Sequence, residues 1–259
     1  MKTKKNQNVY IYGRHAAMEA LASPEKGLVR KVFLAPGLKD TELKDLARKA
    51  GATMAELSIN RATDVELRDA SHQGVVCLVD TGKLMITYKD FASNLKIEKD
   101  TLLVVLGELH DPQNIGAIIR SAAAFGAAGV LIPEHNQGQV TGSVIKVSAG
   151  MAFRVPLVSI GNVNSTLEDL KKKGFWIYGF ASEGEKKLDE ELFDAPTVFV
   201  FGNESKGVRL KTMEACDIRL SIPIDKRCDS LNVSASASVA LYAWSLKHRP
   251  DDGFLMLNN

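Results

Sequence analysis

The sequence predicts an α/β protein whose larger part is a mostly parallel sheet with helices on both faces. Apolar, β-branched runs alternate with stretches of helical spacing along most of the chain. The run Leu102–Leu106 is apolar throughout, as expected of a parallel strand buried on both sides. Near Gly82 polar and charged residues replace this periodicity. We therefore expect a front unit at 8–80, a linker at 81–98, a second unit at 99–249 and a loose tail at 250–259.

The front unit reads as a small α/β sandwich. The segment Asp40–Ala50 places apolar residues on one face of a helix, and Gly51 follows where a helix C-cap is expected. Val29–Leu34 is β-branched and apolar, as strands are. The full expectation is helices at Gly13–Leu21, Asp40–Ala50 and Asp64–Asp69, and strands at Val29–Leu34, Thr53–Leu57 and Gly74–Val79.

The second unit alternates strands with helices, which is typical of parallel sheets. A helix is expected over Asn114–Phe125, where Gly126 ends it, and a long helix over Ser230–Lys247. Short apolar runs bounded by turn residues predict the strands. Those strands are Leu102–Leu106, Gly129–Ile132, Phe175–Phe180, Val198–Phe201 and Ile218–Ile224.

Composition excludes several classes. The 259 residues are 45% hydrophobic and 25% charged, which excludes disordered and fibrous proteins. The net charge of +2 argues against a strongly basic nucleic-acid coat, although the first 80 residues hold 13 basic and 10 acidic residues. The lysines at positions 2, 4 and 5 are expected in a frayed terminus.

Cysteine use and targeting signals favour a cytoplasmic protein. Cys77, Cys216 and Cys228 form no CxxC pair and leave an odd count, so neither a disulfide framework nor a zinc knuckle is expected. No secretory signal is visible, and the longest uncharged stretch, 230–246, contains five serines, so no membrane span is expected. The chain has no HExxH, GxGxxG or Walker motif, which argues against metal chemistry, dinucleotide binding and P-loop hydrolysis.

A first polar segment, Glu108–Gly126, ends one strand and opens a helix that Asp111 or Asn114 can cap. Gly116 weakens the first turn, which suggests a close approach to its backbone. The free N–H groups at this helix end suit a phosphate. Arg120 lies among apolar neighbours, where a guanidinium is costly unless it is paired or aimed at a ligand. The alternative is a structural arginine bonded to carbonyls or a carboxylate.

A second segment, Val198–Arg209, leads an apolar strand directly into Gly202, Asn203 and Glu204. Ligands of open α/β sheets bind at this edge, so the loop could wrap a ligand. The alternative is a plain turn, where Gly and Asn are common.

A third segment, Ile222–Val239, has a charged loop followed by a helix that Ser230 or Asn232 opens. Simple capping by Ser230 is the plainest interpretation of that serine. The small serines that follow suit close helix contact and need not be functional.

Together these segments resemble the three motifs of the SpoU-type RNA ribose 2′-O-methyltransferases of the SPOUT class. The matching stretches are DPQNIGAIIRSAAAFG (111–126), FGNESKG (201–207) and IPIDKRCDSLNVSASA (222–237). In the front unit, YIYGRHAAMEAL (10–21) and HQGVVCLV (72–79) resemble the domain that precedes the catalytic domain in some members. That arrangement is most similar to members that methylate a guanosine in the P-site loop of large-subunit rRNA.

The resemblance implies a trefoil knot that holds S-adenosylmethionine, an L30e-like RNA-binding front domain, and a homodimer with its site near the dimer interface. Three positions match residues whose backbone contacts the methyl donor: Gly202, Ile222 and Leu231. Five positions match the polar site residues: Asn114, Arg120, Glu204, Ser230 and Asn232. Ser205 and Lys226 stand where the family usually has glycine, which could alter the loops.

Arg120 is more easily defended as a phosphate clamp and oxyanion stabiliser than as a base, because a guanidinium is protonated up to a pKa above about 12. The other four polar residues are expected to fix Arg120 and the ribose. Two alternatives keep RNA as the substrate or ligand: methylation of tRNA or another rRNA loop, and a non-catalytic RNA-binding ribosome-assembly factor. A small-molecule α/β enzyme is disfavoured by the missing phosphate-loop motifs.

Overall fold

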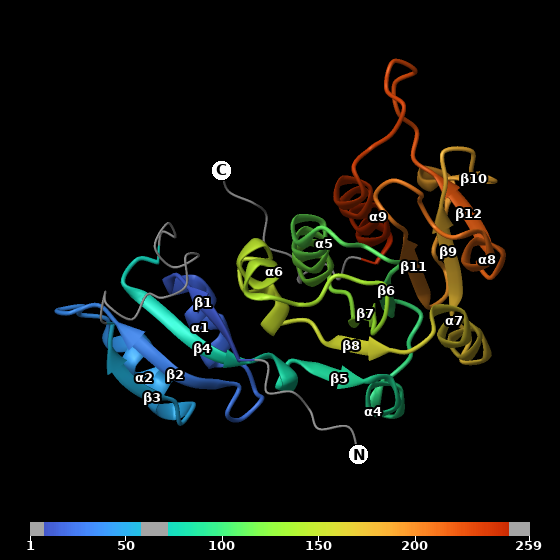
Figure 1. Cartoon of the computed structure of the whole chain (residues 1–259). Coiled ribbons are helices and arrows are strands. Elements are labelled where there is room, and N and C mark those ends of the chain that lie inside the picture. The colour runs from blue at the N-terminus through green and yellow to red at the C-terminus, as the bar shows by residue number, and fades with distance from the viewer. Residues whose placement is uncertain (1–7, 58–71, 249–259) are drawn as a thin grey trace.

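The computed structural model describes residues 8–57 and 72–248, which form two sheets with helices around them (Figure 1). The smaller, front sheet has the strand order β1-β4-β2-β3. Its β2–β3 pair is parallel, and β4 runs antiparallel to both β1 and β2. Its strands are β1 (Asn8–Tyr12), β2 (Val29–Leu34), β3 (Thr53–Glu56) and β4 (Val75–Asp80).

Helices α1 (Arg14–Ala22) and α2 (Thr41–Lys49) complete the front unit, close to their expected positions. The Asp40 side chain accepts the Leu43 N–H and caps α2, and Gly51 takes the left-handed conformation at φ 70°. The expected helix at 64–69 and the tail at 250–259 lie outside the described residues.

The larger sheet has eight strands in the order β10-β12-β9-β11-β6-β7-β8-β5. Every pairing in it is parallel, which confirms the prediction of a mostly parallel sheet. Its strands are β5 (Met85–Thr87), β6 (Leu102–Leu106), β7 (Gly129–Pro133), β8 (Leu157–Ile160), β9 (Trp176–Phe180), β10 (Lys186–Lys187), β11 (Thr197–Phe201) and β12 (Ile218–Ser221).

Helices cover both faces of this sheet, as expected (Figure 1). Side chains alternate along β6, so Val104 packs in one buried cluster and Val105 in another. The first cluster includes α5 (Pro112–Ala124), α6 (Gly142–Val147) and α9 (Val233–Lys247). The second includes α4 (Tyr88–Asn94) and α7 (Val163–Lys172), and α8 (Leu210–Glu214) packs on α7.

Residues 81–98 connect the two units, but they are not irregular as the linker prediction implied. They contain a 3₁₀ turn at Thr81–Lys83 followed by β5 and α4. Strand β5 pairs with β8, where Ile86 lies opposite Val158, and Phe91 of α4 is buried in the larger unit. Hydrogen bonding to β8 therefore makes part of the connection an edge of the larger sheet, which local polarity could not reveal.

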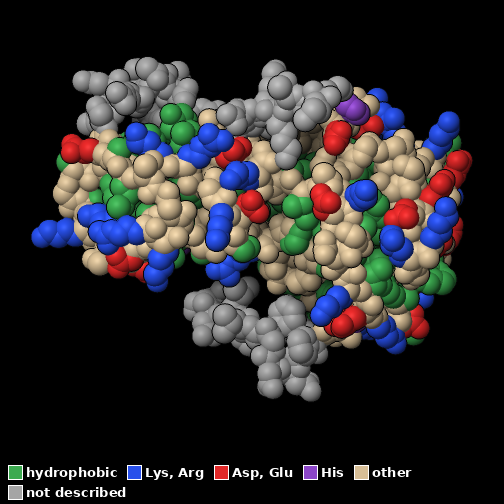
Figure 2. Space-filling view, turned by 90° about the horizontal axis from the view of Figure 1, so that it is seen from below, with side chains coloured by type: hydrophobic (Ala, Val, Ile, Leu, Met, Phe, Trp, Pro, Cys, Tyr) green, Lys and Arg blue, Asp and Glu red, His purple; other side chains and the backbone are tan. Residues whose placement is uncertain are grey.

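The front unit packs against α6 and the turn that follows it. A Cβ on Gly142 would lie 2.7 Å from the Tyr10 carbonyl oxygen, so this glycine allows α6 to approach β1. The Arg154 guanidinium pairs with the Glu19 carboxylate across the same contact. Figure 2 shows basic and acidic side chains interspersed over one face of the molecule, in keeping with its near-zero net charge.

Candidate active site

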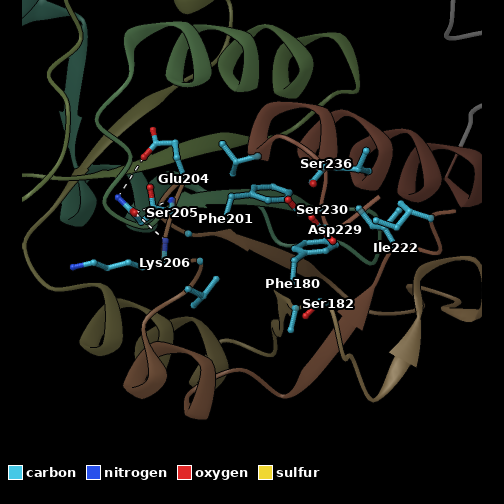
Figure 3. Close-up of a pocket in the computed structure, with 18 of the residues that line it drawn as sticks. Phe180, Ser182, Phe201, Glu204, Ser205, Lys206, Ile222, Asp229, Ser230 and Ser236 are labelled. Atoms are coloured by element: carbon cyan, nitrogen blue, oxygen red, sulfur yellow. Dashed lines mark hydrogen bonds between the residues drawn. The ribbon is translucent and has the colours of Figure 1, made fainter. Parts of the chain in front are cut away.

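A pocket of about 700 Å³ lies at the carboxyl ends of β9, β11 and β12 (Figure 3). Phe180 ends β9 and Phe201 ends β11, and their rings stack in the pocket wall with centroids 4.9 Å apart and planes 13° from parallel. Leu220 and Met213 add apolar surface. The carboxyl edge of a parallel sheet is where ligands of such folds bind, and the volume suits a small molecule.

The loop after β11 folds back onto its own start at Gly202. Asn203 and Gly207 exchange two backbone hydrogen bonds of 2.9 Å each. A Cβ on Gly202 would lie 2.1 Å from backbone atoms of Gly207 and Val208. Only glycine therefore fits at the floor of this loop, which forms one wall of the pocket.

Glu204 anchors this loop to the start of α5. One carboxylate oxygen accepts the backbone N–H groups of His110 and Asp111, each at 3.1 Å, and the Asn114 amide at 3.4 Å. Burial opposes ionisation, but these hydrogen bonds, together with one from the Glu204 backbone, outweigh it and lower the pKa of the carboxyl group. Glu204 thus holds the two residues just before α5, and Asp111 accepts the first-turn Gln113 N–H, so the protein's own carboxylates lie at the helix end where a phosphate was expected.

Asn114 connects that anchor to the third segment. Its side chain is buried, and its carbonyl oxygen accepts a hydrogen bond from the Asn232 amide at 3.0 Å. The Asn232 carbonyl oxygen in turn accepts the Ser234 and Ala235 N–H groups and caps α9. The hydrogen bonds Glu204–Asn114–Asn232 therefore join all three segments singled out in the sequence.

Local hydrogen bonds show which residues cap the two helices. Asp111, rather than Asn114, caps α5 by accepting the Gln113 N–H at 2.8 Å. Asn232, rather than Ser230, caps α9, so the capping interpretation of Ser230 is wrong. Ser230 instead lines the pocket. The sequence offered two capping candidates at each helix, and the local hydrogen bonds of Asp111 and Asn232 decide between them.

Arg120 lies apart from this cluster. Its side chain is exposed on α5, does not line the pocket and has no hydrogen bond or ion pair with any other described residue. The expectation that neighbouring polar residues fix Arg120 is therefore not met within one chain. The close approach expected at Gly116 does occur, but to α6, because an added Cβ would lie 2.6 Å from Val147.

The remaining expected residues gather at the pocket. Its lining includes Gly202, Glu204, Ile222, Ser230 and Leu231. The sequence prediction missed the stacked aromatic wall, although aromatic residues at two strand ends were a usable signal. It also missed three charged lining residues, which are Lys206, Asp225 and Asp229.

The two positions that lack the family's usual glycine have ordinary backbones. Neither Ser205 nor Lys226 has a positive φ, whereas Gly207 in the same loop as Ser205 does, at 66°. Asp225 holds the other loop in a turn by accepting the Arg227 backbone N–H at 2.9 Å and pairing with its guanidinium. Neither Ser205 nor Lys226 therefore needs the left-handed backbone conformation that favours glycine.

The pocket suits the methyl donor that the sequence resemblance implies. S-adenosylmethionine joins a flat aromatic base and a ribose to a sulfonium and an amino-acid end that carries an ammonium and a carboxylate. Stacked Phe180 and Phe201 offer apolar surface for a base, and Asp229 offers a carboxylate for positive charge, whereas Asp225 is already paired with Arg227. The lining residues therefore suit both the apolar and the cationic parts of this molecule.

Two features are absent from residues 8–57 and 72–248. No helix there is long and apolar enough to cross a bilayer. No three His, Cys, Asp or Glu side chains lie together there as metal ligands would.

Comparison with known proteins gives consistent matches. Residues 101–242 match the SpoU rRNA Methylase family, and residues 10–84 match RNA 2′-O ribose methyltransferase substrate binding. The 23S rRNA (guanosine-2′-O-)-methyltransferase RlmB of Shewanella oneidensis is 33% identical over 92% of this chain and 96% of its own. RlmB of Pseudomonas syringae is 35% identical over 90% of this chain and 93% of its own.

The fold has a solved counterpart in the SpoU methyltransferase AviRb from Streptomyces viridochromogenes, in complex with the cofactor AdoMet. The two superpose with a TM-score of 0.77 at 23% identity, over 93% of this chain and 90% of that one. Because the family match covers more than half of the sequence and the relatives match nearly its full length, the chain belongs to the SpoU rRNA Methylase family.

Proposed function

We propose that the protein transfers a methyl group from S-adenosylmethionine to a ribose 2′-oxygen of RNA, and that its target is a guanosine of 23S rRNA. The observation that carries the proposal is that three segments far apart in sequence are joined beside one pocket by hydrogen bonds among Glu204, Asn114 and Asn232. Relatives over 30% identical and matched along nearly their full length are 23S rRNA guanosine methyltransferases. A ribosomal RNA substrate supports a cytoplasmic location as part of this proposal.

The pocket residues have distinct tasks in this reaction. S-adenosylmethionine supplies an activated methyl group on a sulfonium. The backbone at Gly202, Ile222 and Leu231 binds it, and the stacked Phe180 and Phe201 exclude water from the base. Ser230 faces the pocket and positions the ribose. Holding donor and acceptor in line supplies much of the rate.

The ribose hydroxyl must lose its proton as it attacks, so negative charge grows on the 2′-oxygen. Arg120 stabilises that charge and the adjacent phosphate, since a guanidinium stays protonated and donates to both. Glu204, Asn114 and Asn232 are positioning residues, because their polar atoms already bond to one another or to helix termini.

Arg120 reaches a pocket only in a homodimer under this proposal, because it lies outside the pocket of its own chain. Helices α5 and α9 lie side by side on one face of the sheet. Val239, Tyr242 and Leu246 of α9 are 41%, 46% and 48% exposed, at spacings that place them along one side of the helix. An exposed apolar stripe of this kind suits a second copy of the chain.

The knot implied by the sequence resemblance is part of the same proposal. Membership of the SpoU rRNA Methylase family and the close packing of backbone around the pocket support it. A Cβ on Gly202 would lie 2.1 Å from backbone atoms of Gly207 and Val208, and one on Gly184 would lie 2.4 Å from the Ser221 backbone nitrogen.

Mapping 2′-O-methyl groups on total RNA from strains with and without this gene tests the proposal. The expected result is one guanosine of 23S rRNA that loses its methyl group in the deletion strain and regains it with the wild-type gene. Loss of a 2′-O-methyl group at a tRNA position or in another rRNA loop would identify that position as the target in place of the 23S rRNA guanosine. No change at any position would favour an RNA-binding assembly factor.

A further inference from the structure

The front sheet has two faces of different character. Ile11, Val32 and Cys77 point to one face, where they are buried in the core with α1 and α2. The strand register places a different set on the other face, because directly opposed residues point the same way. Tyr12 and Phe33 both lie opposite Val76. Tyr10 and Lys31 both lie opposite Leu78.

This second set forms an aromatic face that we define as Tyr10, Tyr12, Lys31 and Phe33. The Tyr10 and Phe33 rings are 6.2 Å apart between centroids. Lys31 Nζ lies 5.1 Å from the Phe33 centroid. Tyr10 is 38% exposed although it is a large aromatic residue within a strand. The face therefore offers an accessible ring beside an ammonium group.

A second ammonium group comes from the larger unit. Lys146 of α6 is exposed, and its Nζ lies 4.8 Å from the Tyr12 centroid. Helix α6 packs directly on β1, through Gly142, and on α5, through Val147 against Gly116. The aromatic face thus spans the contact between the two units, and a ligand on it touches both.

An exposed aromatic ring beside two half-buried ones, with flanking lysines, suits one class of partner. Unpaired bases stack on such rings, and the lysines bind the neighbouring phosphates. The bases of an A-form duplex are stacked and paired, so a duplex cannot use the rings. We propose that the aromatic face binds an unpaired segment of the RNA substrate beside the target nucleotide. This inference rests on the proposed function for the identity of the RNA.

Binding of a 5′-fluorescein dodecauridine to the full chain, followed by fluorescence anisotropy, tests the stacking. Tyr10→Ala should weaken binding by roughly 5- to 100-fold, and Tyr10→Phe should keep most of it because the ring remains. Met54→Ala is the matched control. Met54 is 40% exposed in the same sheet, but it lies opposite Val32 and so points to the helix-covered face. The affinity of Met54→Ala for dodecauridine should stay within about twofold of wild type.

The lysines are tested by the salt dependence of the same binding. Lys31→Met and Lys146→Met should each weaken binding and lower the slope of log affinity against log salt by about 0.7, the value for one phosphate contact on a single strand. Lys49→Met on the exposed side of α2 makes the same charge change elsewhere and should leave the slope unchanged. A 12-base-pair RNA duplex should be insensitive to Tyr10→Ala.

Several results would overturn the proposal. These are undetectable dodecauridine binding by the wild-type chain, equal losses for Tyr10→Ala and Met54→Ala, or equal effects on single strand and duplex. A change of mass in light scattering on Tyr10→Ala, with RNA affinity unchanged, would assign the face to a protein contact instead. Thermal unfolding checks that each variant is folded. If Tyr10→Ala unfolds, the test rests on Lys31→Met, which should bind dodecauridine more weakly than wild type, and on Tyr10→Phe, which should keep most of the affinity.

Failure of the proposed function is distinguishable. If the wild-type chain binds dodecauridine through Tyr10 but transfers no methyl group to 23S rRNA, the RNA-binding role of the aromatic face is supported and the proposed activity is wrong. If methyl transfer to 23S rRNA is intact and Tyr10→Ala leaves both binding and transfer unchanged, the activity stands and the face is wrong.

Discussion

The Asn232 side-chain amide donates a 3.0 Å hydrogen bond to the side-chain carbonyl oxygen of Asn114, 118 residues earlier in the chain. The bond joins the starts of helices α5 and α9. The Asn114 amide nitrogen meanwhile donates to Glu204. The amide of Asn114 can donate to a carboxylate and accept from another amide at once, whereas an ionised carboxylate in its place could only accept. The burial of Asn114 makes this double role costly to lose, because an unpaired buried polar group has no water to replace its partner.

Replacement of Asn114 by Asp should destabilise the fold. The change is nearly isosteric but removes the donor and places a second carboxyl group beside Glu204, so we expect a loss of about 1–3 kcal/mol in the free energy of unfolding. Urea unfolding measures it. Asn94→Asp, at an exposed residue of α4 whose amide donates only within its own helix, is the control and should change stability by less than about 0.5 kcal/mol. Equal losses in the two variants would contradict the double role of Asn114.

Glu204 should make stability depend on pH in a defined direction. Hydrogen bonds lower its pKa in the folded chain, so its contribution is present above the unfolded-state pKa and is lost as the pH falls through the folded-state pKa. The thermal midpoint of wild type should exceed that of Glu204→Gln most at about pH 7, and the gap should narrow toward about pH 3. Glu183→Gln, at an exposed carboxyl, should show no such narrowing. A gap that stays constant with pH would exclude ionisation of Glu204 as its source.

Elements made by continuous apolar runs were predictable from sequence. Val29–Leu34 and Leu102–Leu106 occupy the expected strands residue for residue, because burial on both faces or of alternate residues leaves a local pattern. Strand β8 (Leu157–Ile160) was missed, although β3 and β12, which also have four residues, were expected. Strand β5 was missed because its pairing with β8 lies 72 residues away along the chain, between Met85 and Leu157.

The site was predictable as three segments but not as a geometry. Polar residues after strands at one sheet edge indicated where Glu204 and Asn114 lie. Their hydrogen bonds depend on partners about 90 residues apart, which no local pattern contains. Arg120 shows the reverse, since its apolar neighbours in sequence suggested burial, whereas its side chain points to solvent on α5. Helical spacing indicates a face but not what covers that face.

Gly202→Ala should abolish tight binding of S-adenosylmethionine. The added methyl group would meet backbone atoms of Gly207 and Val208 at 2.1 Å, and neither can move without opening the loop that walls the pocket. We expect at least about a tenfold loss of affinity by calorimetric titration, in line with the cost of overpacking. Gly161→Ala is the control, because a Cβ there meets nothing within 4 Å. Unchanged affinity in Gly202→Ala would show that the loop is not part of the cofactor site.

Arg120→Ala should abolish methyl transfer while sparing the fold and cofactor binding. The side chain is exposed and has no bond to another described residue, so its removal should change the free energy of unfolding by less than about 0.5 kcal/mol. Incorporation of labelled methyl groups into 23S rRNA measures the loss, and titration of the cofactor measures the part that remains. Arg48→Ala, at an exposed arginine of α2, should transfer methyl groups as wild type does. Substantial turnover by Arg120→Ala would remove this residue from the reaction.

The three cysteines should differ sharply in reactivity, and one should report on the pocket. Burial raises the pKa of Cys77 and of Cys216 to about 12, so both remain thiols near pH 8 and react slowly with iodoacetamide. Cys228 is exposed and lines the pocket, so it should be alkylated first. Saturating S-adenosylmethionine should slow that alkylation, and peptide mass spectrometry over time measures the rate at each position. Cys228→Ser supplies the control, since its labelling should fall to the slow background of the buried thiols. If the cofactor left the rate at Cys228 unchanged, the loop that carries it would lie outside the bound molecule, and the pocket between β11 and β12 would have to be reassigned.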